Sequence, residues 1–287
     1  MGLRAALLAL LAAAALSGCG SARLSVPSSG AQLTPGTKIT RELTRLPAPK
    51  GKIAVAVYGF RDQTGQYKPA PDSSFSTAVT QGGVSMLIKA LLDSGWFIPV
   101  ERENLQNLLT ERKIVRALEA PSPAAAPGGP PPIPHLLPAS IVVEGGITAY
   151  ESNVRSGGIG AHYLGVGLST LYRVDQVTVN LRTVDIRSGK ILSSVSTTKA
   201  IYSYEVRPTV FKFVNFKDLV QFEAGMTRNE PAQMCVREAI EAAVIHLVAQ
   251  GLKDGHWELK DEAARSSFLQ REESREHDAA PGALAAP

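Results

Sequence analysis

The glycine-rich segment 154–175 is the part of the sequence that most constrains the fold. Five glycines lie among residues 157–167, and each glycine inside a helix costs about 1 kcal/mol relative to alanine, so no stable soluble helix forms there. Phosphate-binding loops have a different spacing, because no lysine follows these glycines and Tyr163 stands where a dinucleotide motif requires its third glycine. The segment is therefore neither a helix nor a nucleotide-binding loop.

A second unusual segment, 204–228, alternates between apolar and polar residues in its latter half. Neighbouring residues of a strand face opposite sides, so Val220 and Phe222 would lie on one face while Gln221 and Glu223 lie on the other. The earlier half is less regular, and a bulge or a turn is needed there. This pattern predicts an amphipathic hairpin.

Both segments match transmembrane β-hairpins, which are apolar outside and polar inside, and carry aromatic residues toward the membrane interfaces. Soluble hairpins packed on a domain would show the same alternation. A membrane barrel leaves no strand edge unpaired in lipid, and two hairpins supply only four strands. The membrane interpretation therefore requires several copies of this chain to close one barrel.

The N-terminus predicts a lipoprotein. Residues 1–18 have a basic Arg4 and an Ala/Leu run ending at Leu16, which is too short to span a bilayer and reads as a signal peptide. The sequence Leu-Ser-Gly-Cys ending at Cys19 is a lipobox pattern, which predicts a lipid on that thiol; the alternative is an ordinary signal peptide and an unrelated cysteine. Each buried CH₂ of the acyl chains contributes about 0.8 kcal/mol to anchoring. Gly20, where an aspartate would favour inner-membrane retention, favours the outer membrane.

The remainder predicts an α+β fold, in which an α/β periplasmic domain with a mixed sheet and flanking helices carries the two hairpins. Apolar runs predict strands at 52–58, 96–100 and 140–145, and helical periodicity predicts helices at 82–92 and 103–118. The predicted divisions are a lipidated tether (19–50), the first part of the domain (51–153) with a loop (65–81) and a proline-rich loop (120–138), hairpin 1 (154–175), a domain hairpin (176–203), hairpin 2 (204–228), a C-terminal helical part that begins at Asn229 (229–260) and a charged, Ala/Pro-rich tail (261–287).

Composition and motifs exclude several functions. The net charge of +4 arises from interspersed charges of both signs, without a basic patch that contains aromatic residues, so nucleic acid is not an expected partner. The five histidines have no metal-ligand spacing, and no nucleophile elbow or Walker motif occurs. Cys235 lies in an apolar helical pattern and predicts a buried structural thiol. We expect neither an enzyme nor a cofactor, apart from the covalent lipid on Cys19.

Several short stretches, distributed from about Leu46 to Trp257, have a distinctive sequence. They are Leu46–Ile53, Ser74–Val79, Trp96–Pro99, Asn107–Ile114, Tyr150–Val154, Leu192–Val195 and Asn229–Pro231. All of them closely resemble the CsgG family, the curli secretion channel of the bacterial outer membrane. The resemblance covers nearly the whole folded region, and segments 154–175 and 204–228 fall where the family has its two membrane hairpins.

The resemblance implies a ring of nine protomers that each give four strands to one barrel, which agrees with the size of the largest known barrels. The family narrows its pore with the loop corresponding to 65–81, where rings of Tyr, Asn and Phe side chains form a constriction. Those positions are Ala70, Ser74 and Phe75 here. The smaller side chains predict a wider aperture, unless Tyr67, Pro69 and Pro71 tilt inward to compensate. The alternative role for Phe75 is a core anchor for the helix that follows.

The function implied by the resemblance is an ATP-independent, gated pore that exports unfolded curli subunits from the periplasm to the cell surface. The implied partners are further copies of the chain, outer-membrane lipid, unfolded curli subunits, a periplasmic cap and surface accessory curli factors. The predicted lumen-lining residues are Arg155, His162, Arg173, Asp175, Glu205, Gln221 and Glu223. The alternative is a non-pore envelope lipoprotein that acts as a binding or assembly module, with the hairpins as docking surfaces.

Overall fold

The computed structural model describes residues 33–67, 77–119, 133–158, 169–207, 210–214 and 230–279. The chain divides into a unit of residues 1–35 and a larger unit, Gly36–Pro287, to which the fold below belongs. The predicted signal peptide and Cys19 lie outside the described residues.

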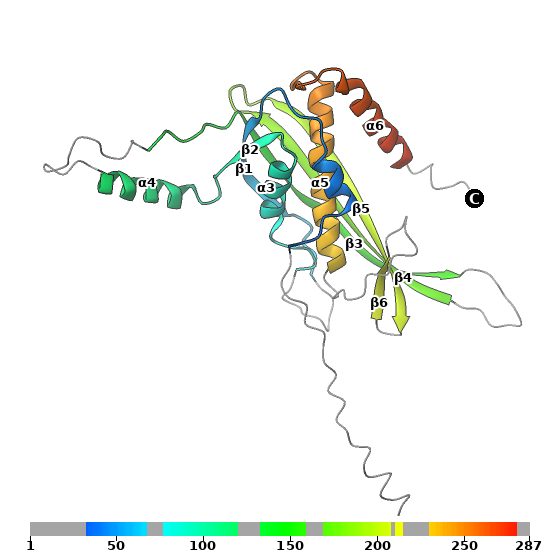
Figure 1. Ribbon diagram of the computed structural model, residues 1–287. Coiled ribbons are helices and arrows are strands. Elements are labelled where there is room, and N and C mark those ends of the chain that lie inside the picture. Colours follow the sequence, from blue (N-terminus) through cyan, green and yellow to red (C-terminus); the bar gives the residue numbers. More distant parts are fainter. Residues whose placement is uncertain are drawn as a thin grey trace, which may run out of the picture. The chain divides into compact units, whose positions relative to one another are not determined.

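The described residues form one six-stranded sheet in the order β2-β1-β3-β4-β5-β6 (Figure 1). The strands are β1 (Ile53–Asp62), β2 (Phe97–Val100), β3 (Ile141–Gly158), β4 (Ser169–Asp185), β5 (Ile191–Arg207) and β6 (Val210–Val214). β1 pairs in parallel with β2 and β3, whereas β3 to β6 pair antiparallel. Parallel neighbours need crossover connections, which here contain helices. The predicted mixed sheet is confirmed.

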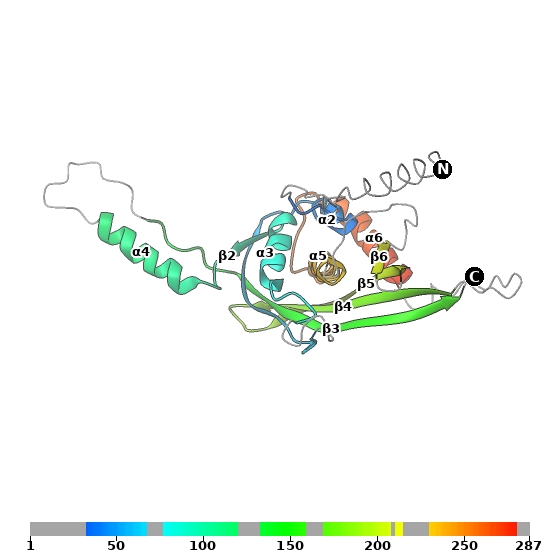
Figure 2. The same ribbon diagram turned by 90° about the horizontal axis from the view of Figure 1, so that it is seen from below.

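One long helix covers the sheet. The helices are α2 (Lys38–Leu43), α3 (Gly83–Asp93), α4 (Leu105–Glu119), α5 (Glu230–Lys253) and α6 (Ala264–Ala279). Figure 2 shows α5 directly over one face of the sheet, with α2, α3 and α6 on the same side. Because α5 lies between the sheet and these helices, it buries residues around most of its circumference, including Val236, Ile240 and Leu247.

A tryptophan pair closes the core beyond the end of α5. The rings of Trp96 and Trp257 have centroids 6.0 Å apart, and Phe97 meets Trp257 edge-on at 5.5 Å. Trp96 also donates its indole N–H to the carbonyl oxygen of Pro47 at 2.8 Å. A Cβ atom at Gly251 would collide with the Trp257 ring, so this position requires glycine.

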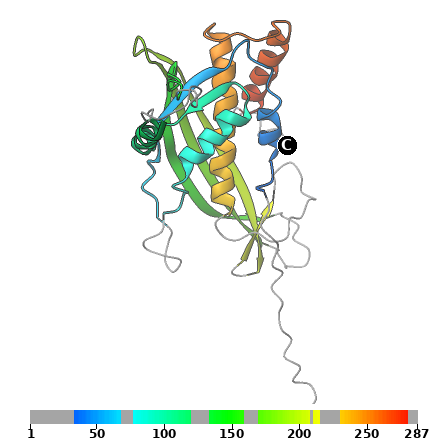
Figure 3. The same cartoon turned by 60° about the vertical axis from the view of Figure 1, so that its left-hand side comes forward.

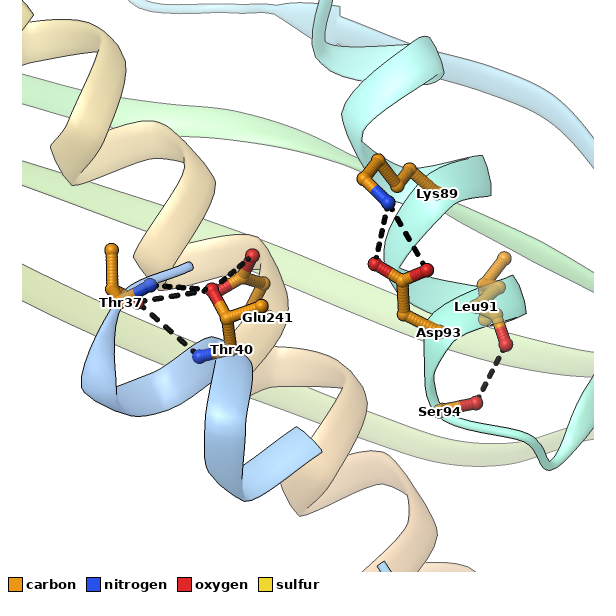
Figure 4. A network of polar contacts seen from close by, with 7 residues as sticks. All are labelled: Thr37, Thr40, Lys89, Leu91, Asp93, Ser94 and Glu241. Carbon is orange, nitrogen blue, oxygen red and sulfur yellow. Dashed lines mark hydrogen bonds and ion pairs between the residues drawn. The ribbon is translucent and has the colours of Figure 1, made fainter. Parts of the chain in front are cut away.

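The segment before residue 50 differs from the predicted tether. Helix α2 buries Leu43 completely, and the Thr37 side chain caps the helix by accepting from the Thr40 backbone N–H. Thr40 in turn hydrogen-bonds to the carboxylate of Glu241 on α5 (Figure 4). The folded domain therefore begins near Thr37, because a short polar sequence finds its partners on α5.

The C-terminal segment also differs from the predicted tail, since it contains α6. Phe268 is buried, and Arg275 forms ion pairs with Glu272 on the same helix and with Glu42 on α2. Figure 3 shows α6 beside the upper part of α5. A sequence that is charged overall thus docks through buried apolar side chains, of which Phe268 is the most buried, and through ion pairs.

Helix α4 confirms the predicted helix 103–118, but it projects away from the sheet (Figures 1 and 2). Ile114 is 46% exposed and Leu118 is 80% exposed. The proline-rich loop 120–138 follows, of which residues 133–138 are described.

The predicted domain hairpin is confirmed by the connection between β4 and β5. The Asp185 carboxylate accepts from the Ser188 backbone N–H at 2.9 Å and from the Ser188 hydroxyl. These two bonds lower the pKa of Asp185. Gly189 has a φ of +70°, which glycine adopts readily.

Candidate functional site: the strands that extend from the domain

Strands β3 and β4 are much longer than the domain needs. They contain 18 and 17 residues, whereas strands in globular proteins usually have about 5–6. Their antiparallel pairing runs from Ile141↔Asp185 to Gly158↔Ser169. One continuous ribbon therefore joins the domain sheet to the segment predicted as hairpin 1.

Strands β5 and β6 form the corresponding start of the segment predicted as hairpin 2. Their pairing runs from Tyr202↔Val214 to Arg207↔Val210. The register shifts between Glu205 and Arg207, which agrees with the bulge or turn expected in the irregular half of 204–228. The alternating half, 220–227, lies outside the described residues.

A bulge at Thr148 changes the phase of β3. Val143 and Ile147 are buried in the core, but after the register shift between Ile147 and Ala149 it is Tyr150 that packs against the core. The Thr148 hydroxyl donates to the carbonyl oxygen of Thr178 at 3.3 Å. Such bulges re-aim the side chains that follow them, so Thr148 sets which positions of the extension share a face with the core.

On the neighbouring strand β4, close to this bulge, Asp175 is completely buried. Tyr150 donates its phenolic O–H to the Asp175 carboxylate at 3.0 Å, and the Cys235 thiol donates to the Asp175 backbone carbonyl at 3.4 Å. Asp175 therefore lies inside the protomer, which corrects its predicted lumen-lining position. The reason is that α5 packs over β4 at Asp175, where the Cys235 thiol contacts the strand.

Two further polar contacts lie on the same face of the sheet. Lys199 on β5 forms an ion pair with Glu238 on α5 at 2.6 Å, and the Thr197 hydroxyl donates to the Ala239 carbonyl oxygen at 2.7 Å. The Cys235 thiol is close enough to Asp175, Lys199 and Glu238 to sense their charges. Its pKa is nevertheless raised chiefly by burial, which makes it the predicted inert structural thiol.

Sequence reasoning missed this polar group, although a signal was present. Every second residue of β4 is buried and apolar from Val177 through Val179 to Leu181, and Asp175 occupies the next position in this series. A charged residue in phase with a buried apolar row indicates a paired carboxylate. Only the structure shows the partners, because Tyr150 is separated from Asp175 by a long segment of the chain.

Three other predicted lumen residues lie in described strands. Arg155 pairs with Tyr172, and Arg173 pairs with Val154. Glu205 pairs with Phe211. His162, Gln221 and Glu223 lie outside the described residues.

The predicted constriction loop is described only at its ends. Tyr67 and Thr77 form an isolated antiparallel bridge, and Ala78 donates its backbone N–H to the Gln66 carbonyl oxygen at 2.9 Å. The two ends of the loop are thereby held together at the end of β1. Ala70, Ser74 and Phe75 themselves lie outside the described residues.

The described part of the chain contains neither a membrane-spanning helix nor a group of potential metal ligands. Its helices are all too short or too polar to cross a membrane. No group of three or more His, Cys, Asp and Glu side chains within it could hold a metal ion.

Comparison with known proteins identifies the family. Residues 37–277 match the family described as "Curli production assembly/transport component CsgG". The proteins of that name from Salmonella typhimurium and Escherichia coli K12 are each 49% identical, over 92% and 91% of this chain and 94% and 93% of their own lengths. The chain therefore belongs to the CsgG family. A protein named "Putative transcription activator protein HfaB" from Caulobacter vibrioides is 31% identical, over 85% of this chain and 79% of its own length.

Membership of the CsgG family confirms the resemblance inferred from the sequence. It assigns the chain a curli-related role in the cell envelope as an assembly or transport component, and this is not an enzymatic role. The match includes α2 and nearly all of α6, so both helices belong to the family's fold.

Proposed function

We propose that this chain is one protomer of an outer-membrane secretion channel, a gated pore that exports unfolded curli subunits without ATP. The observation that carries this proposal is the length of the β3–β4 ribbon, which stays paired as far as Gly158 and Ser169. After Tyr150, β3 continues from Glu151 to Gly158 and is still paired there. A strand that crosses a bilayer needs about 9–11 residues, so an extension of this length is in keeping with one arm of a membrane hairpin.

The ribbon has one requirement that a single chain does not meet. In lipid, every strand edge must be paired, yet the two hairpins of one chain supply four strands. Closure therefore needs a ring of copies, for which the family resemblance implies nine. The lipid expected on Cys19 would deliver each copy to the outer membrane and hold it there until the ring closes.

Transport through such a pore would be passive. A narrow opening admits an extended polypeptide and excludes a folded one by size. Phe75 would offer a transient apolar contact at the constriction, while polar lumen residues would hydrate the chain without binding it tightly. Fibre assembly at the cell surface would remove arriving subunits and give direction, helped by a periplasmic cap and surface accessory curli factors.

Planar-bilayer recording tests the proposal with the purified full-length chain at ring-forming concentrations. We expect large, stable conductance steps of uniform size. Their absence, in a preparation whose rings are seen by electron microscopy, would overturn the channel proposal.

The second candidate is a non-pore envelope lipoprotein that acts as a binding or assembly module. It is favoured by α4, which projects from the domain and exposes Ile114 and Leu118. Ile114→Ser with Leu118→Ser provides the discriminating variant. Under the channel proposal, rings of the variant that still form give the same conductance steps as rings of the native chain. Under the binding-module proposal, neither the native chain nor the variant gives conductance steps.

A further inference from the structure

Four side chains form what we call the polar junction: Tyr150, Asp175, Lys199 and Glu238. They come from β3, β4, β5 and α5, at the level where the three strands pass beyond the apolar core. The contacts that hold them include the Tyr150–Asp175 hydrogen bond at 3.0 Å and the Lys199–Glu238 ion pair at 2.6 Å. Asp175 is fully buried, and Glu238 is 8% exposed.

Stability alone does not explain the polar junction. Removing two charges from water is costly, and well-packed apolar residues at such positions are often as stabilising or more so. Apolar residues also flank the Asp175 side chain, since Val177 follows it in the same buried row and Ile201 is its partner on β5. The best-attested use of buried polar contacts is instead to select one register among several.

Register matters unusually at this place. A slip of one residue turns every position of a strand to the other face, and glycine-rich strands specify their register weakly. Beyond the polar junction, β3 runs into Gly157 and Gly158. Within the domain, the buried row Val177, Val179 and Leu181 fixes the register of β4, but this row does not oppose a slip confined to the extension, in which Val174 would lie at the level of Asp175. The extension therefore needs a register determinant at its base.

We propose that the polar junction locks the register of hairpin 1, with Asp175 as the positioning residue. The Thr148 bulge sets the phase of β3, and the Tyr150–Asp175 bond then fixes β4 against it. The Cys235 thiol adds a contact from α5 to the same residue of β4. The lock itself concerns only the pairing of β3 with β4. Its consequence is that it decides which faces of 154–175 meet lipid and which meet the lumen, and this consequence rests on the proposed channel function.

Cross-linking of paired cysteines in the full-length chain in membranes tests this register directly. Ser156→Cys with Leu171→Cys is the aligned pair, because these residues face each other across β3 and β4. Ser156→Cys with Thr170→Cys is the shifted pair. In the otherwise native chain, we expect the aligned pair to cross-link and the shifted pair to remain reduced.

Asp175→Leu should lower the ratio of aligned to shifted cross-links about tenfold, because it removes a buried hydrogen bond to a charged group. Asp175→Asn keeps an acceptor for Tyr150 and should retain the native ratio, as should Glu151→Gln, an exposed neighbour on the other face. Asp175→Leu takes an acceptor away from the Tyr150 hydroxyl, so its thermal unfolding midpoint should fall below that of the native chain, and the cross-link ratio is measured on folded protein. If this variant does not fold, Tyr150→Phe, which removes only the phenolic donor, replaces it.

A native cross-link ratio in folded Asp175→Leu, or in Tyr150→Phe where that variant replaces it, would overturn the register lock. Conductance is recorded on the same preparations. If the register depends on Asp175 but the native chain forms no pore, the channel proposal is overturned and the register lock is retained. The two failures are therefore distinguishable.

Discussion

The hydroxyl of Thr40 lies 3.0 and 2.8 Å from the two carboxylate oxygens of Glu241, and this contact attaches helix α2 to helix α5 (Figure 4). The residue that carries the contact also caps its own helix, because the Thr40 hydroxyl lies 3.0 Å from the Thr37 backbone nitrogen, for which it is the acceptor. The start of the folded domain is thus joined to its central helix through a buried carboxyl group.

Glu241 predicts a pH dependence of stability. Burial raises the pKa of Glu241 above its unfolded value of 4.5, although Thr40 and Arg237 oppose the shift. A raised carboxyl pKa adds stability that is fully present below pH 4.5 and is lost as pH rises through the folded pKa. Glu241→Gln should therefore unfold at a higher temperature than the native chain at pH 7, and this advantage should vanish near pH 4.5. Thermal unfolding across that range measures it.

Glu258→Gln is the matched control for this prediction. Glu258 is exposed and its pKa is lowered, chiefly by the hydrogen bond from Lys50. Its contribution is present above pH 4.5 and is lost as pH falls through the folded pKa, so the sign is opposite. An identical pH profile for both variants would contradict the assigned role of Glu241 burial.

Gly251 predicts a packing defect. Gly251→Ala places a Cβ atom against the Trp257 ring, so it should destabilise the domain by about 1–3 kcal/mol, as overpacking typically does. Denaturant unfolding measures the loss. Gly59→Ala is the control, since its Cβ would meet no atom within 4 Å; equal effects of the two substitutions would contradict the close approach of Trp257.

Phe268 predicts that the C-terminal region is part of the fold. Phe268→Ala should cost about 3–5 kcal/mol, the usual range for a buried phenylalanine. Amide hydrogen exchange should show α6 losing protection before the sheet does. The exposed Gln270→Ala change on the same helix should leave protection unchanged, and a similar loss in both variants would mean that α6 does not dock through Phe268.

The side chain at position 70 should affect the diameter of the pore. If position 70 faces the constriction, Ala70→Tyr adds a ring of aromatic side chains and should lower single-channel conductance. Recording in planar bilayers measures this, with Ala263→Tyr on the exposed surface of the domain as control. Unchanged conductance in the Ala70 variant would mean that the constriction loop has been misplaced.

Delivery of the chain to the outer membrane should depend on Cys19. Cys19→Ser removes the thiol that would carry the lipid, so the chain should fail to reach the outer membrane and pore function should be lost, while the α/β domain keeps its circular dichroism spectrum. Membrane fractionation measures delivery. Full recovery of the serine variant in the outer membrane would show that the lipid is dispensable.

Local patterns predicted most of the regular elements correctly. Four of these elements depend on residues that are close in sequence. They are the β-branched run of β1, the periodicity of α3, the start of α5 after Asn229 and the turn at Gly189. The family was also evident from short motifs. By contrast, α2 and α6 were assigned to a tether and a tail, because their short or charged sequences become ordered only through contacts with α5.

The glycine-rich segment and the alternation near Phe222 were sufficient, from sequence alone, to predict strands instead of helices and to point toward a membrane hairpin. The sequence did not determine where the domain ends and the extension begins. That boundary depends on the Thr148 bulge and on the Tyr150–Asp175 contact, which joins two strands through the fold. Strand periodicity reports which residues share a face, but only tertiary packing determines which face a helix covers, and α5 covers Asp175.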